Sequence, residues 1–342
     1  MTEKVTRVSG TRLAALVAGA AVLCVLPFLV SDYAVSQLNQ YLFLVLAVLG
    51  LNVLSGFSGQ ISLGHGAFLA IGAYVAALCI NDLGIHHFLT IPISAVVCFF
   101  AGLAIGFPAL RLSGHYLALA TFALSLAMPQ VLKHKSIQSW TGGVQGVLVA
   151  SPEIPVLSIG GYVLDIDRWF YFETLILTII VFFLVWNLLR GRVGRALIAL
   201  RDHSLAASTM GVNVGAYKAI TFGVSASITG IAGNLIAVTT GFVAPDSFTV
   251  IVSISLLVGS VIGGIGSILG APFGAIFIHY LPDFAQRLSN SAPTAVYGAL
   301  LLVVVYVLPG GVAGLIRTFV PRRPRIEPKG TISSHTQHVP KQ

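Results

Sequence analysis

The most constraining feature of this sequence is a stretch of 49 residues, 33–81, that contains no Asp, Glu, Lys or Arg. A single helix of that length would extend about 73 Å, whereas the hydrocarbon core of a bilayer is about 30 Å thick. The chain must therefore reverse, and the glycine- and serine-rich segment 55–64 is the only place suited to a reversal. We expect two membrane spans, 38–55 and 65–80, on either side of this first break.

A second charge-free stretch, residues 247–282, repeats the pattern. As one helix it would extend about 54 Å, so the glycine-rich segment 263–272 supplies a second break, between spans 248–264 and 270–288. Apolar runs of sufficient length predict further spans at residues 13–30, 91–110, 115–132, 170–189, 218–241 and 293–309.

Together these segments predict an all-α membrane protein, a polytopic helical bundle of about ten transmembrane helices with broken segments. The apolar part of segment 270–288 is shortened by Pro282, Asp283 and Arg287, which leaves open whether it crosses completely. Only 9% of the residues are charged, against roughly a quarter in soluble domains. A soluble enzyme is therefore excluded.

The charges also predict an orientation. With the N-terminus inside and ten spans, the interior segments hold 15 Lys and Arg residues and the exterior segments hold 4. This asymmetry follows the positive-inside rule, so the net charge of +8 reports membrane orientation and not nucleic-acid binding. We expect a cytoplasmic N-terminus (1–12) and a transmembrane domain (13–316) with one long external loop (133–168) and one long cytoplasmic loop (190–217). A disordered basic cytoplasmic tail is expected at 317–342.

Motifs for catalysis, metal binding or nucleotide binding are missing from the sequence. It has no phosphate-binding loop with a G-x-x-x-x-G-K-[ST] pattern and no H-E-x-x-H pair. Cys24, Cys79 and Cys98 lie in apolar runs without paired spacing, so we expect buried thiols and no metal site. No charged residue is expected in the middle of a span, which argues against a self-powered ion-coupled carrier. An external source of energy is expected.

The first break carries a set of polar side chains that we take as a candidate substrate path. Non-helical backbone at membrane depth is tolerated only where it is buried in protein or lines a cavity. The break therefore either lines a polar path or is a tight turn whose glycines allow close packing, and both interpretations stay open. The second break has Ser267 as its only polar side chain, which favours packing. The candidate path residues are Ser55, Ser58, Gln60, Ser62 and His65.

The cytoplasmic loop 190–217 contains a predicted amphipathic helix. Residues 195–201 favour a helix, and we expect it to continue to a stop at Gly211. Spacings of three and four residues place apolar side chains on one stripe. Such a helix can lie on lipid headgroups, dock into a partner's groove or be solvated. The stripe consists of Ala196, Leu197, Leu200, Ala207 and Met210.

Several long motifs resemble those of a known family. Residues 50–68 read GLNVLSGFSGQISLGHGAF and continue into Gly-Ala-Tyr at 72–74. This run closely resembles the signature of permease subunits of branched-chain amino acid ABC transporters. Residues 194–213 are similar to that family's cytoplasmic loop, although Leu205 stands where the broader pattern of ABC importers has glutamate. Segments 113–121 and 263–275 fit as well, so the resemblance covers roughly residues 38–310.

The resemblance implies an inner-membrane permease of an ABC importer for Leu, Ile and Val. It also implies its partners: a homologous second permease, two ATP-binding cassette ATPase subunits that hydrolyse ATP, and a periplasmic or lipid-anchored solute-binding protein that loop 133–168 helps to receive. The permease itself would be no enzyme and would need no cofactor. Urea or short-amide import, and a self-sufficient channel or secondary carrier, remain alternatives. The resemblance makes the amphipathic helix of loop 190–217 the coupling helix of the importer. Its implied ATPase contacts are Arg195, Leu200, Arg201, Ala206, Ala207 and Gly211.

Overall fold

The structure is a computed structural model that describes residues 23–109, 114–151, 158–159, 162–163, 165–288, 292–307 and 311–314. The expected cytoplasmic N-terminus (1–12), the first ten residues of the expected span 13–30 and the basic tail (317–342) lie outside these residues. Of the expected external loop, the structure describes the whole first half and only short pieces of the second.

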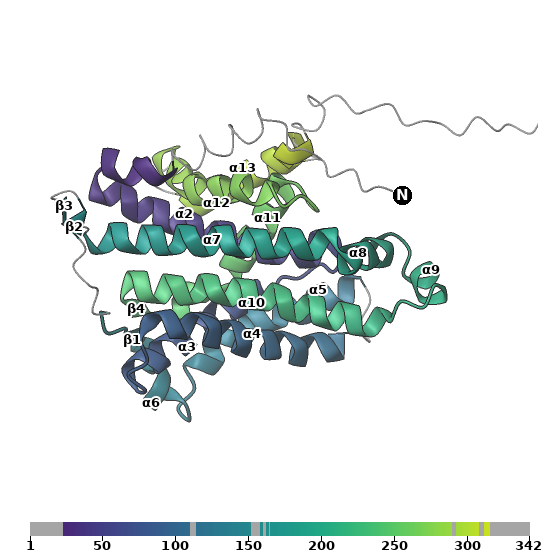
Figure 1. Ribbon diagram of the computed structural model, residues 1–342, viewed down its shortest axis with the longest axis horizontal. Coiled ribbons are helices and arrows are strands. Elements are labelled where there is room, and N and C mark those ends of the chain that lie inside the picture. Colours follow the sequence, from purple (N-terminus) through teal and green to yellow (C-terminus); the bar gives the residue numbers. More distant parts are fainter. Residues whose placement is uncertain are drawn as a thin grey trace, which may run out of the picture.

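Long helices make up the bundle. Helices α4, α7 and α10 lie roughly parallel along the long axis of the molecule (Figure 1). The long helices are α2 (Asp32–Asn52), α3 (His65–Asn81), α4 (His87–Ala109), α5 (His115–Leu132), α7 (Ile166–Arg190), α10 (Val214–Thr240), α11 (Val250–Gly263), α12 (Gly270–Leu288) and α13 (Pro293–Val307).

Short elements connect the long helices. Two antiparallel pairs of two-residue strands, β1 (Val147–Leu148) with β4 (Phe242–Val243) and β2 (Ser158–Ile159) with β3 (Tyr162–Val163), are a small departure from the purely helical expectation. The remaining connectors are η1 (Val53–Phe57), α6 (Gln138–Thr141), η2 (Gly143–Gln145), α8 (Arg192–Asp202), α9 (Ser204–Thr209) and η3 (Pro245–Phe248).

Six helical segments within the described part of the chain are long and apolar enough to cross a membrane, and α3 is a shorter apolar helix. An all-α membrane protein is therefore supported, while the count of about ten spans stays a prediction. The six segments are Asp32–Phe57, His87–Pro108, His115–Leu132, Ile166–Arg190, Val214–Thr240 and Pro245–Gly263.

The centre of the bundle is formed by α2, α3 and α10. Most residues of α2 and α10 are buried, whereas only about a third or fewer of the residues of α4, α5 and α7 are, as is typical of membrane-facing helices. Helices α3 and α10 approach each other closely at Gly72 and Gly230, because a Cβ atom on Gly72 would lie 2.1 Å from the carbonyl oxygen of Gly230. Small residues at such crossings allow the backbones to pack together in a membrane.

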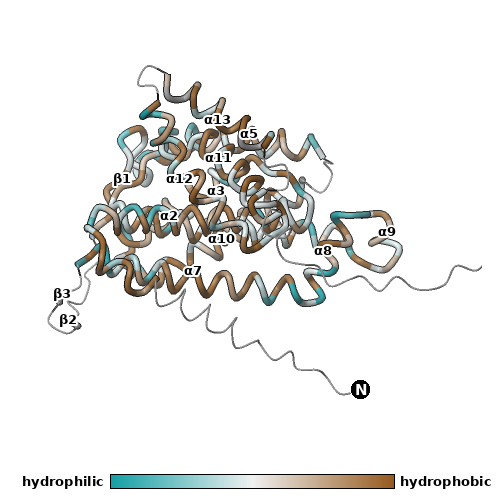
Figure 2. The backbone as a smooth tube through the Cα atoms, turned by 90° about the horizontal axis from the view of Figure 1, so that it is seen from above, coloured by the Kyte–Doolittle hydropathy of each residue, from teal (hydrophilic) through white to brown (hydrophobic). Residues whose placement is uncertain are grey.

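The chain reverses at two opposite ends of the bundle. At one end lie α8 and α9, together called the elbow, and both predicted breaks; we name it the elbow end. Figure 2 shows hydrophobic residues along α7 and a mixture of hydrophilic and hydrophobic residues around α8 and α9. At the distal end lie α6, β1 and β4. Two ion pairs join segments there, Arg168–Asp32 at 2.8 Å and Lys133–Asp246 at 2.5 Å.

Candidate functional site

The first break begins inside a widened helical turn. Helix α2 continues into the π-helix η1, and the chain leaves helical geometry only from Ser58 to Gly64, before α3 begins. The reversal thus starts three residues later than expected. The N–H groups of Ser58 and Gln60 both donate to the carbonyl of Leu54, at 3.2 and 3.3 Å. Turns of π-helix occur frequently at functional sites, so this one marks the break as a candidate site.

The polar side chains of the first break are buried and hydrogen-bonded within the chain. Ser55 Oγ donates to the carbonyl of Gln60 at 3.1 Å, and Ser58 Oγ donates to that of Leu54 at 2.8 Å. Gln60 Nε2 donates to Ser58 Oγ at 2.8 Å and to the carbonyl of Lys218, near the start of α10, at 3.3 Å. These side chains hold the shape of the break and attach it to α10.

His65, the first residue of α3, is fully buried between three helices. Its Nε2 lies 2.7 Å from Ser225 Oγ, and its Nδ1 lies 3.1 Å from Ser62 Oγ. Ser225 Oγ donates to the carbonyl of Gly50 at 2.6 Å, so it accepts from Nε2–H, and Nδ1 accepts from Ser62. A neutral His65 therefore ties α3 to α2 and α10.

The two breaks, far apart in sequence, form one junction. The side-chain amide of Asn52 donates through Nδ2 to the carbonyl of Ser267 at 2.7 Å and accepts through Oδ1 from the N–H of Gly266 at 2.9 Å. A Cβ atom on Gly56 would lie 2.4 Å from the nitrogen of Gly266, so only glycine permits this approach. We call Asn52, Gly56, Gly266 and Ser267 the break junction.

The elbow consists of two helices where the sequence predicted one. Helix α8 ends at Asp202, His203 takes an extended conformation with φ −151° and ψ 91°, and α9 follows. Of the predicted stripe, Leu197, Leu200 and Ala207 are buried, whereas Met210 is 86% exposed. The chain bends at His203, so the stripe is divided between α8 and α9.

The implied ATPase contacts separate into three groups. Leu200 and Ala207 are buried at the root of the elbow, whereas Arg195, Ala206 and Gly211 are exposed. Arg201 turns back toward the bundle. Its Nη1 donates to the carbonyl of Gly56 at 2.8 Å, and its Nε donates to Asp202 Oδ1 at 3.1 Å.

Helix α9 protrudes from the elbow end of the bundle (Figure 1). Leu205 and Met210 are 84% and 86% exposed, which places them among the most exposed large apolar side chains in the described part of the chain. An apolar tip on a protruding helix is the type of surface that docks into a groove of another protein.

A pair that the sequence analysis missed lies toward the distal end. His87 Nε2 is 3.5 Å from Glu173 Oε2, and both side chains are buried. The available signal was the position of Glu173 inside the apolar run 170–189. Its burial brings one ionisable group into the helix bundle, near the start of α7 and not in the middle of the span.

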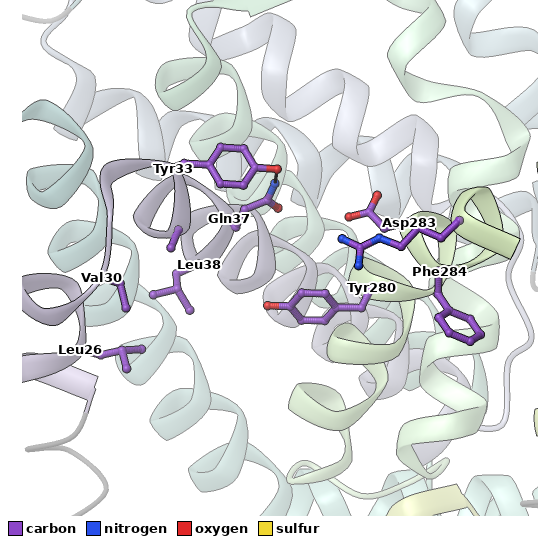
Figure 3. Close-up of a pocket in the computed structure, with 10 residues that line it drawn as sticks. Leu26, Val30, Tyr33, Gln37, Leu38, Tyr280, Asp283 and Phe284 are labelled. Atoms are coloured by element: carbon purple, nitrogen blue, oxygen red, sulfur yellow. Dashed lines mark hydrogen bonds between the residues drawn. The ribbon is translucent and has the colours of Figure 1, made fainter. Parts of the chain in front are cut away.

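The distal end also contains a pocket of about 480 Å³ between α2 and α12 (Figure 3). Gln37 Nε2 donates to Tyr33 Oη at 2.8 Å on one wall, and Asp283 and Arg287 belong to the other. Among the described residues neither of these two charges has an ion-pair partner within 4.0 Å. No group of His, Cys, Asp or Glu in the described part of the chain could hold a metal ion.

The comparisons with known proteins agree with this architecture. The family model for the branched-chain amino acid transport system permease component matches residues 33–308. The chain is 31% identical to the high-affinity branched-chain amino acid transport system permease protein LivM of Salmonella typhimurium and 32% identical to that of Escherichia coli K12. Each of these alignments covers 85% of this chain and 72% of the relative.

A more distant relative is BraD of Pseudomonas aeruginosa, also described as a high-affinity branched-chain amino acid transport system permease protein. It is 25% identical over 79% of this chain and 91% of its own length. No solved structure matches. The match to the family model and the two LivM relatives establish that the chain belongs to the family of branched-chain amino acid transport system permease components.

Proposed function

We propose that this protein is a permease subunit of an ATP-binding cassette importer in the bacterial inner membrane. With a second, homologous permease it forms the path for Leu, Ile and Val delivered by a solute-binding protein. The relatives named above support the substrate class, because they are described as branched-chain amino acid permeases. ATP hydrolysis is assigned to two separate subunits, since the sequence has no phosphate-binding loop.

The observation that carries the proposal is the exposed apolar tip of the elbow. Leu205 and Met210 lie at the protruding α9, while the root of the elbow is buried against the bundle. We assign this tip, together with the exposed Arg195, Ala206 and Gly211, to the groove of an ATPase subunit on the cytoplasmic side. The buried Leu200 and Ala207 hold the elbow on the bundle.

The opposite end is assigned to the solute-binding protein. The expected external loop begins there with α6, η2 and β1, next to the two ion pairs of the distal end. Both termini are then cytoplasmic, as the distribution of basic residues predicts.

The transport path is assigned to the surface shared with the second permease, with the first break as part of its gate. Ser55, Ser58, Gln60, Ser62 and His65 shape this gate, because their hydrogen bonds maintain the break. Transport requires at least two conformations of similar free energy, one open to each side. ATP-driven movement of the elbow shifts the balance between them.

Uptake of labelled leucine tests this function. Cells that express the complete transporter should accumulate leucine, and unlabelled isoleucine and valine should compete while urea should not. Competition by urea alone would instead favour the urea or amide permease.

Reconstitution distinguishes the transporter class. We expect liposomes with both permeases, the two ATPase subunits and the binding protein to take up leucine only with ATP. Uptake into liposomes that contain this chain alone would identify a self-sufficient channel or carrier and contradict the proposal.

A further inference from the structure

We propose that Arg201 is the positioning residue through which the elbow moves the break junction. This inference rests on the proposed function, since it assigns the elbow's movement to ATPase subunits. It differs from a docking role for Arg201, because the guanidinium is hydrogen-bonded to the carbonyl of Gly56 in the first break.

Arg201 contacts the first break through a hydrogen bond between its charged side chain and a backbone carbonyl that the break leaves available. The π-helical turn and the end of the helix divert the N–H groups of Ser58 and Gln60 to the carbonyl of Leu54. The carbonyl of Gly56 accepts from Arg201 Nη1 at 2.8 Å. Since a guanidinium is always charged in proteins, the bond is charge-assisted and stronger than one between neutral groups.

The side chain of Arg201 is seated against both breaks at once. A Cβ atom on Gly59 would lie 2.8 Å from Arg201 Cγ, and one on Gly266 would lie 3.1 Å from Nη1. Gly59 has a φ of +71° and Gly266 a φ of +76°, so both positions also favour glycine for their backbone conformation. Arg201 therefore occupies a notch whose two sides belong to segments more than 200 residues apart.

The other end of this connection is rigid. Leu197, Leu200 and Ala207 form a buried cluster that fixes the elbow as one unit. Arg201 Nε donates to Asp202 Oδ1 at 3.1 Å, which orients the guanidinium toward Gly56. On the far side, Asn52 joins the two breaks through its side-chain amide. A displacement of α8 is therefore passed to Gly56, and from Gly56 to both breaks.

The short range of the hydrogen bond between Arg201 and Gly56 makes this connection sensitive to movement of the elbow. A hydrogen bond is lost when donor and acceptor separate beyond about 3.5 Å. A movement of the elbow by an ångström or so therefore either carries the junction with it or breaks the contact. Without Arg201 the elbow would still bind its partner, but its movement would reach the breaks only weakly.

The experiment compares Arg201→Gln with Arg192→Gln in the complete transporter. Both substitutions remove one positive charge from α8. Arg192 is exposed, and its side chain makes no hydrogen bond or ion pair with another described residue. Three quantities are measured: co-purification of the ATPase subunits, ATP hydrolysis in liposomes with loaded binding protein, and leucine transported per ATP hydrolysed.

For Arg201→Gln we expect normal co-purification and hydrolysis, and about tenfold less leucine per ATP, a factor that corresponds to about 1.4 kcal/mol. Arg201→Lys keeps the charge with a shorter reach, so its ratio of leucine to ATP should lie between those of Arg201→Gln and the wild type. Arg192→Gln should match the wild type.

Three outcomes would overturn the inference. Loss of ATPase co-purification in Arg201→Gln would make Arg201 a docking residue, and an unchanged transport ratio would make the contact passive. Failure of both Arg201 variants to assemble would show a purely structural role. If the wild-type protein itself binds no ATPase subunit, the proposed function fails instead, which distinguishes the two.

Discussion

At the scale of single residues, the bundle contains polar side chains that are buried in pairs. His65 is satisfied by two serine hydroxyls, whereas His87 and Glu173 meet at 3.5 Å without a hydrogen bond of good geometry. A buried polar group that loses its partner costs far more than the pair contributes when it is complete. The loss of stability on substituting one member of such a pair therefore depends on whether the other polar group is left buried without a partner.

We expect His87→Leu to lower the apparent melting temperature of the purified protein by several degrees, because it leaves the Glu173 carboxyl buried without a partner, at a cost of about 1–3 kcal/mol. The neighbouring exposed His86→Leu is the matched control and should have little effect. The double variant His87→Leu/Glu173→Leu should be more stable than His87→Leu alone. Equal melting temperatures for the three variants would contradict a coupled pair.

At the scale of elements, the elbow combines two adjacent alanines with opposite environments. Ala207 is 4% exposed and packs at the root of the elbow, whereas Ala206 is exposed on α9. A bulky charged side chain at position 207 would be buried. At position 206 it would change only the surface offered to a partner. The two positions therefore separate folding of the elbow from docking.

We predict that Ala206→Glu folds normally but reduces co-purification of the ATPase subunits and leucine uptake. Ala207→Glu should lower the melting temperature of the isolated permease, because an unpaired charge is forced into an apolar cluster. Thermal unfolding and co-purification of the two variants are measured side by side. Normal ATPase binding by Ala206→Glu would argue against a docking surface on this face of α9.

At the scale of the whole molecule, the charge distribution and the arrangement of helices together define two ends. The elbow end carries α8 and α9, and the distal end carries the turn between α3 and α4. The prediction from the basic residues is that the elbow end faces the cytoplasm. This orientation is a condition for every role proposed for the elbow.

Thiol labelling measures the orientation. In a Cys24→Ser background, where Cys79 and Cys98 are buried, Leu83→Cys and Leu205→Cys place exposed thiols at the distal end and at the elbow. A membrane-impermeant maleimide added to cells with a permeabilised outer membrane should label position 83 and not 205. Inside-out vesicles should show the reverse. Labelling of position 205 from outside would remove the elbow from the ATPase side.

Much of the secondary structure could be read from the sequence, because a bilayer allows few solutions. Apolar stretches longer than the membrane is thick must reverse, and they do so at glycine-rich segments. The predicted spans 115–132 and 270–288 coincide with α5 and α12, and the two breaks lie at the expected reversals. The sequence motifs at residues 50–68 and 194–213 also marked the first break and the elbow as candidate functional segments.

What the linear order of residues determined is thus where the chain enters, leaves and turns, since these depend on local hydropathy and on glycine. Only the tertiary structure decided that the two turns touch through Asn52, that Arg201 reaches Gly56, and that Glu173 meets His87. These contacts join residues more than 80 positions apart, so no local pattern specifies them. They arise because buried polar groups in a membrane have no water to bind and must find partners on neighbouring helices.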